Sequence, residues 1–99
     1  MLLPRLPLPS PPALLIPGPI LALSALSLTA RLVLAEAQAL RYRGQDASRF
    51  NYYYARRLGY PKDRIQSALR ELEQAGYLVR HYTRPPVRRR LLAFTFPAA

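Results

Sequence analysis

The fold of this protein is decided by residues 59–83, which read GYPKDRIQSALRELEQAGYLVRHYT. Apolar side chains recur there at the i, i+3, i+4, i+7 spacing of one buried helix face, at Ile65, Ala68, Leu69 and Leu72. Gly76 stands where the end of a helix needs a left-handed residue. The following residues 77–82 are rich in β-formers. The stretch therefore predicts an amphipathic helix that opens near Pro61 and runs directly into a strand.

A second strand completes a hairpin at the C-terminal end. We expect strands over residues 77–83 and 89–96, joined by RPPVR at 84–88, where the two prolines suit a stiff tip and exclude a continuous strand. Pro97 ends the fold.

Two further helices are expected before residue 59. The first begins at Ser27 or Thr29, either of which is a suitable N-cap, and ends with positive charge and a glycine at residues 41–44. Its predicted buried face carries Leu28, Leu32, Ala35, Ala39 and Tyr42, widened by Leu26, Val33, Ala37 and Leu40. The second runs from about Asn51 to Leu58, with Ser48 or Asn51 as its N-cap and Gly59 as its stop. The fold class is therefore mainly α with a small β-hairpin (α+β).

The first twenty residues contain seven prolines, which favour extended or polyproline structure over a regular helix. We divide the chain into a proline-rich arm over 1–20 and a folded domain over 21–97. Residues 6–30 carry no charge, but Pro17-Gly18-Pro19 divides this stretch into halves too short to span a bilayer. The prolines also interrupt the apolar centre that a signal peptide needs. We therefore expect a cytoplasmic protein with no membrane partner.

The formal net charge of this 99-residue chain is +10, and it is concentrated in residues 41–99, where thirteen basic groups oppose four acidic ones. Such a balance indicates a polyanionic partner, either nucleic acid or an anionic membrane surface, although a solvated basic surface is the simpler alternative. The absence of cysteine excludes disulfides and thiolate metal sites. We predict no metal or other cofactor, because His81 is the only histidine. We predict no enzymatic activity either, because the acids are scattered and no phosphate-binding loop is present.

Two motifs resemble those of a known family. YARRLGY at 54–60 and QSALRELEQAGYL at 66–78 look like the "LARRLGV" turn and the "alReLeeaGli" helix ending of winged helix-turn-helix proteins from bacteria, phages and plasmids. LSLTARLVL at 26–34 resembles the first-helix opening of the same group, including its replication-initiator-like members. The resemblance covers roughly residues 20 to 96 and implies a three-helix core plus a β-wing.

The resemblance also implies binding of double-stranded DNA, with the third helix in the major groove and the wing on the backbone or the minor groove. Carried onto this chain, the groove-facing residues are Lys62, Arg64, Gln66, Ser67 and Arg70. Arg56 and Arg57 would hold phosphates from the second helix, and the wing residues would be Arg84, Arg88, Arg89 and Arg90. Gln66 suits adenine, and Arg64 or Arg70 suits guanine.

The expected function is that of a small transcriptional regulator acting as a homodimer, with the N-terminal arm and first helix forming the subunit contact. Pro61 replaces the usual Ser or Thr cap, and Asp63 places a negative charge in the first turn of the reading helix. Both departures favour an alternative, in which the domain binds RNA polymerase or a replication factor without reading bases. The tyrosines at 52–54 suit either base stacking or core and dimer contacts.

Overall fold

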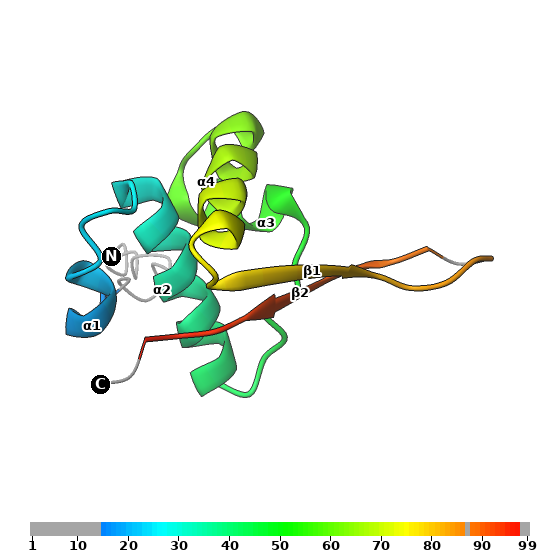
Figure 1. The fold of residues 1–99 in the computed structure, drawn as a ribbon, viewed down its shortest axis with the longest axis horizontal. Helices are drawn as coiled ribbons and strands as arrows, with labels where there is room; N and C mark the ends of the chain where they lie inside the picture. The colour runs from blue at the N-terminus through cyan, green and yellow to red at the C-terminus, as the bar shows by residue number, and fades with distance from the viewer. Residues whose placement is uncertain (1–14, 87, 98–99) are drawn as a thin grey trace, which may run out of the picture.

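The computed structural model describes residues 15–86 and 88–97. A body of helices carries one antiparallel hairpin, which projects away from it (Figure 1). The elements in chain order are α1 (Gly18–Leu21), α2 (Leu28–Tyr42), α3 (Asn51–Leu58), α4 (Lys62–Gln74), β1 (Leu78–Tyr82) and β2 (Arg90–Phe94). The predicted α+β class is confirmed, with one short helix more than expected. Most of the predicted arm, residues 1–14, lies outside the described residues.

Helix α1 corrects the expectation that the chain is extended through residue 20. Pro17 is the N-cap of this helix and Pro19 lies in its first turn, where a proline loses no helical hydrogen bond. Ile20 is fully buried in the core. The short helix thus brings an apolar side chain from the proline-rich segment against α2.

Helix α2 begins as predicted, with the Ser27 hydroxyl accepting a hydrogen bond from the Ala30 N–H at 3.2 Å. Its predicted buried face is wrong at both ends, since Leu28 is 52% exposed and Tyr42 is 93% exposed. Between these ends the prediction is confirmed at Val33, Ala35, Ala37 and Leu40, and the buried face also includes Ala30 and Leu34, which were not predicted. Apolar residues surround most of this helix, so several stripes satisfy the helical period, and packing against α1, α3 and α4 selects one of them.

Helices α3 and α4 are joined by a tight turn at Gly59, whose φ of 77° is in the left-handed region. The predicted buried face of α4 is confirmed, and Gly76 has the expected left-handed conformation with φ of 86°. Neither predicted N-cap of α3 is used, because the cap is Phe50. Ser48 instead accepts the backbone N–H of Leu92 at 2.8 Å, so its hydroxyl joins the connection before α3 to the hairpin.

Strands β1 and β2 pair in a register that runs from Leu78 opposite Phe94 to Tyr82 opposite Arg90. Leu78, Leu92 and Phe94 face the core and are buried, whereas the opposite face is exposed. We call the paired residues 78–82 and 90–94 the root of the hairpin, which is anchored to the core, and the residues between them the tip. The tip lies beyond the helical body (Figure 1). Among the described residues, no helix is both long enough and apolar enough to cross a membrane.

Candidate nucleic-acid interface

The exposed side of α4 carries the predicted groove-facing side chains. Its buried stripe faces α2 and α3, which leaves an outward stripe of exposed residues at Lys62, Asp63, Arg64, Gln66, Ser67 and Arg70. The guanidinium of Arg64 lies 5.4 Å from the centre of the Tyr60 ring, which restrains a cation at the start of the helix. The helix thus presents three cations and two hydrogen-bonding side chains together on its solvent side.

The two glutamates of α4 are engaged elsewhere. The carboxylate of Glu71 accepts hydrogen bonds from the N–H of Ser27 at 2.9 Å and from its hydroxyl at 2.7 Å. Glu73 forms an ion pair with Arg80 on β1 at 2.6 Å. Within the described residues, four of the five acidic side chains have such partners, while Asp63 is exposed on the outward stripe. Asp63 is therefore the one acid on the outward stripe of α4, beside Lys62, Arg64 and Arg70.

The predicted phosphate contacts on α3 lie in different environments. Arg56 is exposed. The side chain of Arg57 is only 18% exposed, and its Nε lies 3.3 Å from Oε2 of Glu36, which is fully buried. Arg57 therefore connects α3 to α2, a role that the sequence did not indicate.

Glu36 is the centre of a polar cluster inside the helical body. The Tyr53 hydroxyl donates to its Oε1 at 2.9 Å, and Nη2 of Arg43 lies 3.7 Å from the same oxygen. Burial raises the pKa of the Tyr53 hydroxyl, and the hydrogen bond to Glu36 raises it further. The sequence signal for this cluster was a carboxylate in the middle of an apolar helix, flanked by Ala35 and Ala37.

The hairpin arginines also divide into two groups. Arg84, Arg88 and Arg89 are exposed at the tip, where the Arg88 guanidinium lies 4.8 Å from the centre of the Tyr82 ring. Arg90 is partly buried at the root: Nη1 donates to Oδ1 of Asn51 at 2.7 Å and Nη2 to the Arg49 carbonyl at 2.9 Å. Desolvation lowers the pKa of Arg90. This arginine fastens the hairpin to α3, whereas the other three are exposed and Arg88 lies over the Tyr82 ring.

The structure brings α4, α3 and the hairpin root into contact with one another, and Figure 1 shows α3 beside α4 and above β1. Among the described residues, no three histidine, aspartate or glutamate side chains form a group that could hold a metal ion. Comparisons with protein-family models, curated proteins and solved structures return no match to this chain.

Proposed function

We propose that this chain is a winged helix-turn-helix protein that binds double-stranded DNA and acts as a small transcriptional regulator. The observation that carries the proposal is the distribution of charge, with exposed cations on α4 and the hairpin tip and most acids engaged in internal contacts. The order of α2, α3, α4 and the hairpin supports it, because this is the layout that the sequence resemblance implies. Helix α4 would enter the major groove, which is wide enough for an α-helix.

Base readout would come from the outward stripe of α4. Gln66 presents an amide that suits the N6 and N7 edge of adenine, and Arg64 or Arg70 suits the O6 and N7 edge of guanine. The exposed Asp63 is suited to accept from a cytosine amino group. Sites selected from a random DNA pool should therefore share a sequence motif. Gln66→Ala should reduce the preference for adenine over other bases, at the one position that Gln66 contacts, by about 1–3 kcal/mol. Selection of no common motif would contradict sequence-specific binding.

Phosphate contacts would come from Arg56 and from the exposed tip arginines, among which Arg88 and Arg89 adjoin the root. The test is fluorescence anisotropy with labelled duplex DNA over a range of salt concentrations. The double variant Arg88→Gln/Arg89→Gln should weaken binding to all sequences alike and reduce the salt slope by about 2, roughly one unit per lost phosphate contact. Arg90 is left intact, because its replacement would also release the hairpin root.

The matched control is Arg41→Gln, which removes an exposed cation at the end of α2, where Arg41 lies over the ring of Phe96. It should leave the salt slope close to that of the parent. Equal slopes for the parent and the hairpin double variant would show that the tip does not contact phosphates.

A protein-interaction module is the second candidate, favoured by the exposed Asp63 and by the cap residue Pro61, which has no hydroxyl to offer a phosphate. Its partner would be RNA polymerase or a replication factor. Weak binding to random DNA, with a shallow salt slope, would favour this candidate over DNA binding.

We also propose a homodimer formed through the first part of the chain. Leu21 on α1 and Leu28 at the start of α2 are both about half exposed, and they offer apolar area to a second copy. Sedimentation equilibrium should give the mass of a dimer for the parent and that of a monomer for Leu28→Glu. A parent that sediments as a monomer at all concentrations would refute the dimer.

A further inference from the structure

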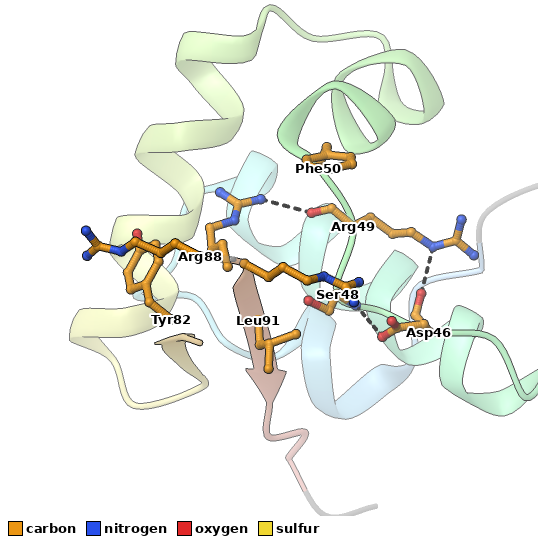
Figure 2. A pocket seen from close by; sticks show the side chains of 9 residues that line it. Asp46, Ser48, Arg49, Phe50, Tyr82, Arg88 and Leu91 are labelled. Atoms are coloured by element: carbon orange, nitrogen blue, oxygen red, sulfur yellow. Dashed lines mark hydrogen bonds between the residues drawn. The ribbon is translucent and has the colours of Figure 1, made fainter. Parts of the chain in front are cut away.

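A pocket of about 430 Å³ lies where the hairpin meets the connection before α3 (Figure 2). One side is formed by residues 46 and 48–50, and the other by Tyr82 and residues 88–91. Its volume is in the range of small-molecule sites. The two sides are held together by the contacts of Arg90 with Asn51 and the Arg49 carbonyl, so the pocket has a fixed frame.

The charge of this pocket is strongly positive. Four arginines and one carboxylate line it, and that carboxylate, of Asp46, accepts the Ser48 N–H at 2.8 Å. The Arg49 side chain already has partners within the protein, since its Nε donates to the Asp46 carbonyl at 2.7 Å and its guanidinium lies over the Tyr53 ring. Arg88 lies over the ring of Tyr82, a residue of the same pocket, and Arg88 and Arg89 are exposed, so both can receive an anion at the opening.

Two exposed aromatic rings border the same pocket. Phe50 is 78% exposed and Tyr82 is 52% exposed, and Figure 2 shows their rings on different sides of the opening. Phe50 occupies the cap position of α3, where its side chain can accept no hydrogen bond from the helix. An apolar ring exposed beside several cations suits a ligand that combines a flat π-face with negative charge.

A nucleotide has this combination, because its base stacks on aromatic side chains and its phosphate pairs with arginine. In a duplex, the faces of each base are covered by the neighbouring base pairs, so only an unpaired base can present a face to Phe50. The pocket also adjoins α3, which packs against the proposed reading helix α4. DNA that contacts Arg88 and Arg89 at the hairpin tip as well as α4 would reach the pocket, because both arginines line it.

We propose that this pocket binds one unpaired nucleotide of the DNA that the chain holds. The base stacks on the exposed ring of Phe50, and its phosphate lies between Arg89 and Arg88, which the Tyr82 ring holds in place. The inference rests on the proposed DNA binding and extends it from uniform duplex to DNA that contains an unstacked base. Such DNA occurs where strands separate.

The test compares a fully paired duplex with the same duplex carrying one bulged adenine, and with a third that carries an abasic bulge. The parent should bind the bulged adenine about 5- to 150-fold more tightly than the abasic bulge, which corresponds to stacking of one base. With 2-aminopurine at the bulge, binding should also reduce the fluorescence of the base, since stacking on a ring quenches it.

Phe50→Ala should abolish this preference while leaving affinity for the paired duplex within about twofold, because the residue is exposed. The control is Tyr42→Ala, which removes an even more exposed ring at the end of α2, outside the pocket lining, and should change nothing. A second variant, Phe50→Leu, keeps the apolar bulk and removes only the π-face. It should also lose most of the preference.

The outcomes separate the two proposals. Binding of paired duplex without any preference for the bulged adenine would overturn the pocket assignment and leave the proposed DNA binding intact. Failure to bind any of the three DNAs would overturn both. Free adenosine monophosphate is the last competitor. If it displaced the bulged duplex at a concentration as low as the dissociation constant of that duplex, the pocket would serve a free nucleotide, which also contradicts the assignment.

Discussion

Replacing Glu36 by alanine should lower the free energy of unfolding by about 3 kcal/mol. The variant loses a hydrogen bond from Tyr53 to a charged acceptor, worth about 1.5–3 kcal/mol. It also loses the ion pairs with Arg57 and Arg43, which contribute at most about 1 kcal/mol each because both side chains retain some solvent exposure. Breaking a buried pair typically costs about 3–5 kcal/mol, and we expect the lower end because the variant no longer buries a carboxylate.

Urea denaturation followed by circular dichroism measures this difference, provided that the m-value is unchanged. The control is Asp63→Ala, which removes an exposed carboxylate and should alter stability by less than about 0.5 kcal/mol. A double-mutant cycle with Glu36→Gln and Tyr53→Phe should give a coupling of at least about 0.5 kcal/mol, since the two side chains are in contact. A loss below about 1 kcal/mol in Glu36→Ala, together with additive behaviour in the cycle, would refute the proposed role of this cluster.

Three further predictions concern the frame of the fold. Arg90→Met should destabilise the protein by about 1–2 kcal/mol in the same urea assay, because two charge-assisted hydrogen bonds at the hairpin root are lost. The control is Arg84→Met at the exposed tip, which should have almost no effect on stability. Ser27→Ala should cost about 1–2 kcal/mol in thermal or urea unfolding, since it removes the cap of α2 and one contact with Glu71; an unchanged midpoint would exclude this capping role. Burial raises the pKa of Tyr54 above its ordinary value of 10.0, so the folded state retains a proton that the unfolded state releases. Stability should therefore fall as pH rises above 10.0, and more steeply in the parent than in Tyr54→Phe; parallel curves from pH-dependent unfolding would contradict this.

The elements with strong local signals could be predicted from the sequence. Helix α4 has a single apolar stripe, and the glycines that follow α3 and α4, Gly59 and Gly76, adopt the left-handed conformation expected after a helix. The hairpin followed from two runs of β-formers separated by prolines, and the N-cap Ser27 from its position before a helical period. Each of these signals depends on residues close together along the chain, so no tertiary information was needed.

The two ends of the buried face of α2 could not be predicted, because apolar residues surround most of the helix and local periodicity does not say where the buried stripe stops. Helix α1 was missed because prolines argue against a helix interior but are tolerated in a first turn. The roles of Arg57 and Arg90 depend on partners that are distant in sequence, Glu36 and Asn51. The amino-acid composition does not distinguish one arginine from another. The fold separates the arginines that connect elements of the structure from those that are exposed to solvent.

The sequence by itself determined the α+β class, the amphipathic α4, the hairpin and the strong positive charge of the C-terminal part. Only the tertiary structure decided that Leu28 and Tyr42 at the ends of α2 are exposed, which acids are engaged internally, and which cations are available to a partner. It also created the pocket between Phe50 and Tyr82, since α3 and α4 lie between Phe50 and the strand that contains Tyr82. The physical reason is that a helical or strand period is a local property, while the partner of a charged or aromatic side chain is set by packing between distant segments.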